Sequence, residues 1–451
     1  MSKLKEKINL IKDSRHIAPI FLVALFLLSF LTLYFNSRVL VAFIAIFTLT
    51  LWIVLISICN FNKALIILCL ILPLRYIGAY MNLIDIGINT WMVISFIAVF
   101  GVKHVINVVK GVDKIKLIPL ILCLCCCLYG FINFQSEGWY KFFSGLILFA
   151  GFYVFYVNGK NINFKQVSYS VIFAPILSAV MSLVYFALFN TSLLMYDGRF
   201  PALCSNPNIL HIYTTLGLAF LIFLLQKRQC SLNKFFTLYM ALSIIGFLTL
   251  SKAFFICFLL LSMYLVAVLF NNSKVVCISF CIAMVIGVLF VLFVFNDFFT
   301  KLFSRFVNAV GESFIDKLLT GRVSVWKEYI DLWTTSPITI IFGCGVTSLT
   351  SKVAQYGIHP HNDYIYFLYR YGIVGTVLIV ATLISFIIYS KNKKNFKLRN
   401  MLLFAMCLIL SLEECITGLL FIPLYMMAAN AIFYPQTETF IIKNNEKRIE
   451  R

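Results

Sequence analysis

The chain has 451 residues, of which 62% are hydrophobic and only 12% are charged. A soluble protein cannot bury that much apolar surface in its core, so the composition excludes a soluble enzyme and predicts that lipid surrounds most of the chain. The formal net charge of +20 does not indicate nucleic-acid binding, because the basic residues lie mainly in short loops between long apolar runs.

The first predicted element is an apolar run over residues 17–34, which follows a basic stretch and has no small-residue cleavage site. We therefore expect a retained membrane span, not a cleaved signal peptide. Apolar runs recur nearly to the end of the chain, and a length of roughly 20 residues per span predicts about 12 to 14 spans. The runs are continuous instead of alternating, which excludes a membrane β-barrel. The predicted fold is an all-α, polytopic transmembrane helical bundle.

The basic loops predict how the spans are oriented. If the basic N-terminus lies inside and each span reverses the side, every later basic loop also falls inside, as expected for positively charged loops. The predicted inner loops are residues 60–63, 103–116, 160–165, 226–234, 271–274 and 391–399. The predicted outer segments are residues 36–38, 82–89, 135–139, 191–208, a tight turn at 251–252, and 296–362.

The last outer segment is the only long loop in this arrangement. Loops of this length are uncommon in compact domains and are often functional. We therefore expect an N-terminal transmembrane region over residues 1–295, a large outer loop over 296–362, and a C-terminal transmembrane region with a basic tail over 363–451.

Four basic residues on the predicted outer side run against the positive-inside bias: Arg199, Lys252, Arg322 and Arg370. A bound anion explains such positions, because guanidinium groups grip phosphate through several charge-assisted hydrogen bonds. The alternative is that each side chain lies along the membrane interface and keeps its charge in water. As a group, the four predict an anion site on the outer face.

A histidine motif, His359-Pro-His361-Asn362-Asp363, stands where the long loop re-enters the membrane. Histidine titrates close to neutral pH, so His361 is a candidate general base. One alternative is a metal site, for which a third ligand is not evident, and another is a structural histidine that caps the following helix. We expect neither a metal nor a cofactor. Because the sequence lacks a phosphate loop, a nucleotide-using enzyme is poorly supported.

These residues resemble a known family. His361-Asn362, followed after nine residues by Gly372-Ile-Val-Gly375-Thr376, resembles the signature of the O-antigen ligase and Wzy-type polymerase superfamily. Ser251-Lys252 stands where such proteins often have Ser-Arg, so the charge is kept but bidentate geometry is lost. Further similarity lies in Gly321-Arg322-Val-Ser-Val-Trp326 before Gly343-Cys-Gly345, and in Arg199 before Ser205-Asn-Pro-Asn208.

The resemblance implies a glycosyltransferase of the bacterial inner membrane whose active site faces the periplasm. Its donor would be an undecaprenyl diphosphate-linked glycan, and its partners would be membrane lipid and a chain-length regulator. His361 and Arg322 would be catalytic, with His361 deprotonating the acceptor hydroxyl in a single inverting displacement. The expected substrate-binding residues are Arg199, Lys252, Arg370, Asn362 and Asp363.

Three functions remain open within this interpretation. A polymerase would transfer a growing glycan to another lipid-linked repeat unit, whereas a ligase would transfer the finished glycan to the lipid A core. We favour the polymerase, partly because the aromatic segment 364–371 offers rings that could stack on sugars. A transporter or flippase of lipid-linked glycans would instead have ionisable residues throughout its spans. Arg75, within a predicted span, is the residue that best fits that alternative.

Overall fold

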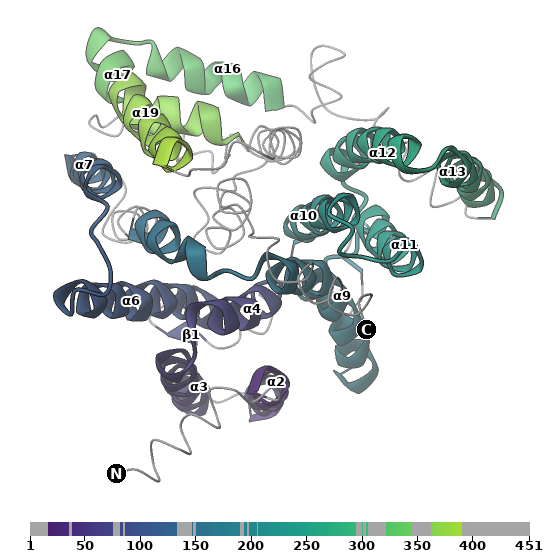
Figure 1. Cartoon of the computed structure of the whole chain (residues 1–451), viewed down its shortest axis with the longest axis horizontal. Coiled ribbons are helices and arrows are strands. Elements are labelled where there is room, and N and C mark those ends of the chain that lie inside the picture. Colours follow the sequence, from purple (N-terminus) through teal and green to yellow (C-terminus); the bar gives the residue numbers. More distant parts are fainter. Residues whose placement is uncertain are drawn as a thin grey trace, which may run out of the picture.

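The computed structural model of the chain (Figure 1) describes the following residues: 17–35, 38–74, 82–83, 86–132, 147, 150–189, 194–195, 198–204, 206–294, 300, 304, 322–344 and 362–389. Apart from two short strands, the described elements are helices. Among them, six helices are long and apolar enough to cross a membrane, and five shorter apolar helices accompany them. The fold is therefore that of a polytopic helical membrane protein, as the sequence predicts. The expected span count and the division into three regions stay predictions.

The elements up to α9 are α2 (Ile17–Phe35), α3 (Arg38–Ile58), α4 (Phe61–Ile71), β1 (Asn82–Leu83), β2 (Ile86–Gly87), α6 (Ile88–Val109), α7 (Leu117–Ile132), the 3₁₀ helix η2 (Gly159–Asn161) and α9 (Phe164–Phe189). The later elements are the 3₁₀ helix η3 (Ala202–Cys204), α10 (Pro207–Gln226), α11 (Leu232–Leu248), α12 (Lys252–Asn272), α13 (Lys274–Val294), α16 (Arg322–Trp333), α17 (Pro337–Phe342) and α19 (Asp363–Tyr389). Strands β1 and β2 pair as a small antiparallel hairpin.

Helix α10 is the central helix of the bundle. Every residue from 210 to 225 is buried, and the helix packs against α9, α11 and α12. A helix that is apolar on all sides is expected to be surrounded by other elements. Apolar character alone does not decide which span is central, because α3 and α12 are more apolar than α10 but less buried. The central position of α10 is a result of packing, and it places the start of this helix at one end of the bundle.

Helix α4 ends halfway through the bundle. Its 11 residues extend only about 16 Å at the rise of an α-helix, and the helix stops just before Pro73, a residue that cannot continue it. The Pro73 carbonyl oxygen accepts hydrogen bonds from Ser178 Oγ and Cys204 Sγ, both at 3.2 Å. The chain after α4 is thus anchored to α9 and η3 within the interior.

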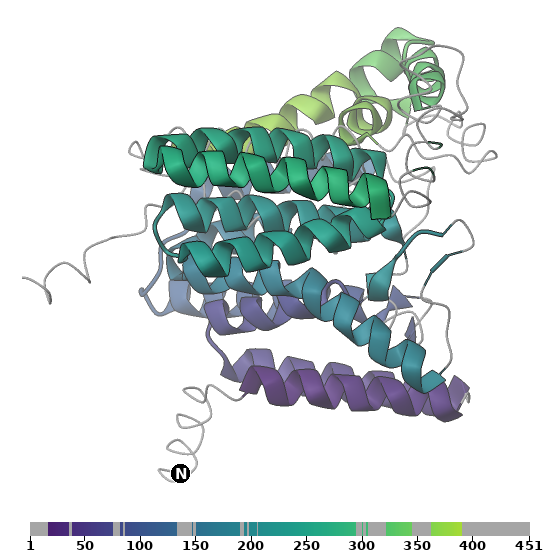
Figure 2. The same cartoon turned by 90° about the vertical axis from the view of Figure 1, so that its right-hand side faces the viewer.

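Four predicted inner loops share one end of the bundle, which lies on the left in Figure 2. We call this the basic end, residues 59–63, 103–116, 158–166 and 226–234. Lys103 Nζ donates to the carbonyl oxygens of Ile56 and Cys59, at 2.8 and 2.9 Å. These bonds satisfy carbonyl groups at the end of α3 and join that end to α6.

Two further contacts complete the basic end. Asn62 Nδ2 donates to Gln166 Oε1 at 2.9 Å, which joins the start of α4 to the start of α9. Lys234 Nζ lies 3.9 Å from the centroid of the Tyr169 ring, which joins α9 to α11. The charge pattern of the sequence predicts that these loops lie together. The side of the membrane that they face stays a prediction.

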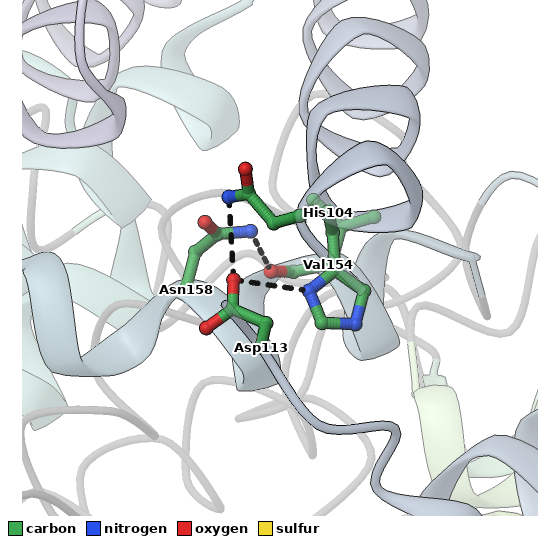
Figure 3. Close-up of polar contacts among 5 residues, drawn as sticks. His104, Asp113, Val154 and Asn158 are labelled. Carbon is green, nitrogen blue, oxygen red and sulfur yellow. Dashed lines mark hydrogen bonds and ion pairs between the residues drawn. The ribbon is translucent and has the colours of Figure 1, made fainter. Parts of the chain in front are cut away.

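A partly buried polar cluster holds the loop between α6 and α7 at the basic end (Figure 3). His104 Nδ1, on α6, lies 3.7 Å from Asp113 Oδ2, and Asn107 Nδ2 donates to the same carboxylate oxygen at 3.3 Å. Asn158 Nδ2 donates to the Val154 carbonyl beside them, at 2.9 Å. The carboxylate therefore closes the loop back onto the last turns of α6.

The opposite end carries several described parts of the predicted outer segments and of the sequence motifs. We call it the motif end, residues 198–204, 206–208, 249–252, 322–344 and 362–372. Helices α16 and α17 lie at this end, on the right in Figure 2. The kinked α19 connects them to the bundle, because Phe367 and Tyr371 belong to the main hydrophobic core.

Candidate functional site

The backbone around Arg199 is held against the end of α11. The Met195 amide donates to the Arg199 carbonyl at 2.8 Å, and the Phe200 amide donates to the Leu248 carbonyl at 3.0 Å. Gly198 has a φ of 77°, a conformation that favours glycine. The segment before α10 therefore reaches Arg199 in a defined conformation.

The Arg199 guanidinium bridges two elements of the motif end. Its Nε donates to the Thr249 carbonyl at 2.9 Å, and its Nη2 donates to Asn208 Oδ1. Thr249 lies in the turn between α11 and α12, whereas Asn208 lies in the first turn of α10. Asn206 caps α10, because its Oδ1 accepts from the Asn208 amide at 2.8 Å. The Asn-Pro-Asn motif thus starts α10 and orients Arg199.

Lys252 is the first residue of α12, directly after the turn that Arg199 contacts. Ser251 caps this helix, with its Oγ accepting from the Phe254 amide at 3.4 Å. Gly246 keeps the turn tight, since a Cβ at this position would lie only 2.0 Å from the Phe254 ring. Arg199 binds a carbonyl three residues before Lys252, so the structure brings these two predicted cations to one turn.

Helix α16 packs along the first half of α19 (Figure 1). The buried rings of Tyr329 and Tyr369 meet edge to face, with their centroids 4.7 Å apart. After α17, the Cys344 Sγ donates to the Leu332 carbonyl at 3.4 Å. Burial raises the pKa of the Cys344 thiol to about 11, so the thiol remains protonated at neutral pH and can donate this bond.

The short helix α17 is tied back onto α16. Ser336 and Thr339 form a reciprocal capping box at its start. Thr339 Oγ1 also donates to the Trp333 carbonyl at 2.7 Å, and Trp333 Nε1 donates to the Ile340 carbonyl at 3.2 Å. Helices α16 and α17 therefore form one compact unit outside the main bundle.

Gly343 and Gly372 bring two backbones into direct contact. A Cβ at Gly343 would lie 2.2 Å from the Arg370 carbonyl oxygen, and a Cβ at Gly372 would lie 2.5 Å from the Gly343 nitrogen. Their φ angles are 89° and 63°, and Gly372 interrupts the helical backbone of α19. Glycine fits both the conformation and the space. Two motifs that are separate in the sequence therefore meet at the α19 kink.

Arg370 lies two residues before this kink and is only 8% exposed. Its Nη1 donates to Tyr366 Oη at 2.6 Å. The guanidinium carbon lies 5.2 Å from the centroid of the Tyr371 ring and 5.7 Å from that of Tyr366, within the range of cation–π attraction. The guanidinium is thus held by a hydroxyl and by two aromatic rings.

Asn362 caps the start of α19. Its Oδ1 accepts from the amides of Tyr364 and Ile365, at 3.0 and 3.2 Å. Among the described residues, this side chain has the capping role that the sequence left open for a histidine. The first turn of α19 is therefore fixed directly after His361, which itself lies outside the described residues.

The packing of α16 on α19 also places Arg322. The ring of Tyr329 on α16 contacts the ring of Tyr369 on α19. Three residues further along α16, the Leu332 carbonyl accepts from Cys344 Sγ. The preceding residue, Gly343, contacts Arg370, which is one residue further along α19 than Tyr369. The two helices therefore run in the same direction. Arg322 and Asn362 each lie seven residues, or about 10 Å along a helix, before the paired tyrosines. This register brings Arg322 and Asn362 to the same end of the helix pair.

The structure thus gathers the predicted residues into two groups at the motif end. Arg199 and Lys252 form one group, and Arg322, Arg370 and Asn362 form the other. His361 and the side chain of Asp363 lie outside the described residues, as do residues 75–81 with Arg75. Sequence reasoning missed the partners Asn208, Thr249 and Tyr366. For Asn208, the Asn-Pro-Asn motif was a signal that could have identified it.

The aromatic segment 364–371 has a different role from the one considered for it. Tyr366, Phe367, Tyr369 and Tyr371 are buried and pack within the protein, whereas Tyr364 is 43% exposed. Among the aromatic residues of this segment, only Tyr364 is thus exposed enough for its ring to stack on a sugar. The segment therefore gives less support to a sugar-stacking surface than its composition suggests.

Comparison with known proteins shows that one part of the chain is similar to a protein family. Residues 235–380 match a protein-family model described as O-antigen ligase. The match begins in α11 and ends in α19, so it includes Lys252, Arg322, both contacting glycines and Arg370. No curated protein and no solved structure matched the chain.

Proposed function

We propose that the protein is a membrane glycosyltransferase that polymerises lipid-linked repeat units into a surface polysaccharide, because residues 235–380 match a family model described as O-antigen ligase. Its donor would be an undecaprenyl diphosphate-linked glycan, and its site would face the periplasm at the motif end. The observation that supports this proposal is that the four predicted anion-binding cations lie at the motif end, in the two groups described above.

The described contacts of the arginines suit a diphosphate. Arg199 is oriented by a carbonyl and an amide oxygen, and Arg370 by a phenol oxygen. These bonds hold the guanidinium groups without themselves cancelling any positive charge. Preorganised cations of this kind stabilise charge that develops in a transition state, often the largest contribution to catalysis.

In the proposed reaction, His361 accepts the proton of the acceptor hydroxyl, and the hydroxyl oxygen attacks the anomeric carbon of the donor. A new glycosidic bond forms as the bond from this carbon to the diphosphate oxygen breaks, with inversion at the carbon. Arg199, Lys252, Arg322 and Arg370 then stabilise the departing diphosphate. Asn362 supports His361 indirectly by fixing the first turn of the adjoining helix.

A ligase is the second candidate, because the matching family model is described as O-antigen ligase and the match does not distinguish a ligase from a polymerase. A ligase would use the same donor and the same leaving group, so the same cations would serve it. The difference lies in the acceptor, which would be the lipid A core instead of another lipid-linked repeat unit. The distinction therefore requires analysis of the products.

The test is a deletion strain complemented with the wild-type protein, His361→Ala or His359→Ala. Lipid-linked and surface glycans would be resolved by size on a gel, and expression would be checked for each variant. We expect core with a single repeat unit in the deletion strain, and a full ladder with wild type. His361→Ala should fail to restore the ladder.

His359→Ala is the matched control, because a general base requires one histidine whereas a metal site formed by both would require each of them. We expect this variant to restore the ladder. Bare core together with long lipid-linked polymer in the deletion strain would identify a ligase instead. Full rescue by His361→Ala would remove this histidine from the chemistry and favour a transporter.

A further inference from the structure

A ridge of polar residues runs along the first half of α19. Asn362, Tyr366 and Arg370 are spaced by four residues, so they lie on one face of the helix. All three are buried, with exposures of 7%, 7% and 8%. The proposed reaction uses Asn362 and Arg370, at the two ends of this ridge, but it does not use Tyr366 in the middle.

The Tyr366 side chain is itself well fixed. Its amide donates to the Asn362 carbonyl at 3.0 Å, as part of the first turn of α19. Its ring packs near that of Phe367, with centroids 6.4 Å apart. Because a tyrosine has only two side-chain torsions, a buried tyrosine in a regular helix is a rigid platform for its hydroxyl.

Arginine, in contrast, is flexible and loses considerable side-chain entropy when it is held in one conformation. The Tyr366 hydroxyl accepts from Arg370 Nη1 at 2.6 Å, and the adjoining Tyr371 ring covers the guanidinium. A hydrogen bond to a charged group is about twice as strong as one between neutral groups. The hydroxyl can therefore select one orientation of the guanidinium plane.

We propose that Tyr366 is a positioning residue, whose hydroxyl orients the Arg370 guanidinium toward the donor diphosphate. This inference rests on the proposed function. Tyr366 acts through Arg370 and does not contact the reacting atoms. Loss of the hydroxyl leaves the charge of Arg370 in place, but the guanidinium group is no longer held in one orientation. The loss therefore slows the step in which the diphosphate leaves.

The experiment compares purified wild-type protein with Tyr366→Phe, Arg370→Ala and the double variant. The probe is the undecaprenyl diphosphate-linked repeat unit isolated from the deletion strain, and the readout is the initial rate of elongation at varied donor concentration. Tyr239→Phe is the matched control, since it also removes a buried hydroxyl, bonded to Ser262 at 2.7 Å, but lies on α11 away from α19.

We expect Tyr366→Phe to lower kcat about tenfold or more, with a smaller change in the KM for the donor. Tyr239→Phe should keep the wild-type rate. The double variant should be no slower than Arg370→Ala alone, because the hydroxyl has no function once its guanidinium is absent.

Two results would overturn the positioning role: a Tyr366→Phe rate equal to that of Tyr239→Phe, or a double variant slower than Arg370→Ala by the full factor of the tyrosine substitution. The second result would mean that Tyr366 acts independently of Arg370. Absence of elongation by the wild-type protein would refute the proposed function itself, and the positioning role with it. That failure is recognised in the wild-type sample, before any variant is compared.

Discussion

Uncharged oxygen atoms orient two of the arginines at the motif end. Arg199 donates to a carbonyl and to an asparagine side chain, and Arg370 donates to a tyrosine. A carboxylate in any of these places would bind the guanidinium more strongly, but it would also compete with an anionic substrate. An uncharged partner therefore leaves the guanidinium group able to bind an anion, and this can be tested by replacing the partner with a carboxylate.

Asn208→Asp adds a carboxylate at the oxygen that already accepts from Arg199. We expect a rate of elongation at least about tenfold lower, because the new charge pairs with the guanidinium and weakens its hold on the diphosphate. Asn206→Asp adds the same charge two residues earlier, where aspartate caps α10 as well as asparagine does. If both variants elongate equally fast, the charge of Arg199 does not serve the reaction.

At the scale of single residues, the sequence singled out the basic residues of the candidate site, but it did not predict the groups to which their side chains bond. A basic residue on the outer side is conspicuous because it violates the positive-inside bias. The roles of Thr249 and Tyr366 depend on which turn and which rotamer meet in space, and neither residue type is unusual at its position. Asn362 was predicted to bind substrate, which stays a prediction, and its described bonds are those of a helix cap.

At the scale of the elements, the decisive feature is the kink in α19. The first half of this helix packs on α16, and its direction changes at Gly372, where the backbone of Gly343 approaches. The glycine spacing in the sequence predicted a family signature. The reason for the glycines, however, is a contact between residues 29 positions apart, which no local pattern predicts.

Gly372→Ala should destabilise the protein and lower its activity. The new Cβ would lie 2.5 Å from both the Gly343 nitrogen and the Ile341 carbonyl oxygen, at a φ of 63°. Such a backbone conformation alone costs about 1–3 kcal/mol for a residue with a side chain. The measurement is the apparent Tm of the purified protein in detergent, together with the elongation rate.

The control for this substitution is Gly287→Ala in α13, where a Cβ would meet no atom within 4 Å. Alanine favours a helix over glycine by up to about 1 kcal/mol, so we expect an unchanged or slightly higher Tm. Equal Tm values for the two alanine variants would show that the approach of Gly343 to Gly372 is not as close as described.

Helix α4 shows a limit of prediction from apolar runs. The predicted loops on either side of it leave one apolar run over residues 64–81, and the described helix within that run ends at Ile71. Pro73 was the available signal, because proline disfavours a continuing helix. The apolar residues around it concealed the break, since hydropathy measures burial and not backbone conformation.

For the whole molecule, the charge pattern predicted correctly that four of the basic loops that the structure describes lie together. Loops separated by about 100 residues meet at the basic end, as in the bond between Asn62 and Gln166. The order in which the spans pack, and the use of α10 as the central helix, could not be predicted in this way. Those features depend on the shapes of many side chains at once.

The orientation of the two ends can be measured with single cysteines. Val112→Cys lies in the loop between α6 and α7, and Leu194→Cys precedes Arg199; the native side chains are 71% and 48% exposed. The native cysteines that the structure describes are buried or half-buried, so their background labelling should be low. In spheroplasts, a membrane-impermeant maleimide should label Leu194→Cys and spare Val112→Cys.

After the spheroplasts are lysed, both variants should react, which controls for the accessibility of each cysteine. Labelling of Val112→Cys in intact spheroplasts, with protection of Leu194→Cys, would reverse the orientation. The motif end would then face the cytoplasm, and a site for a donor on the periplasmic side would have to be abandoned.

The contact between Gly343 and Gly372 also has a mechanical consequence. Side chains between two helices act as a compliant layer, because their torsions can adjust when one helix shifts. Where Gly343 meets Gly372, main chain meets main chain, and no side chain of the described residues separates the two backbones. A displacement of the α16–α17 unit is therefore transmitted directly to the backbone beside Arg370.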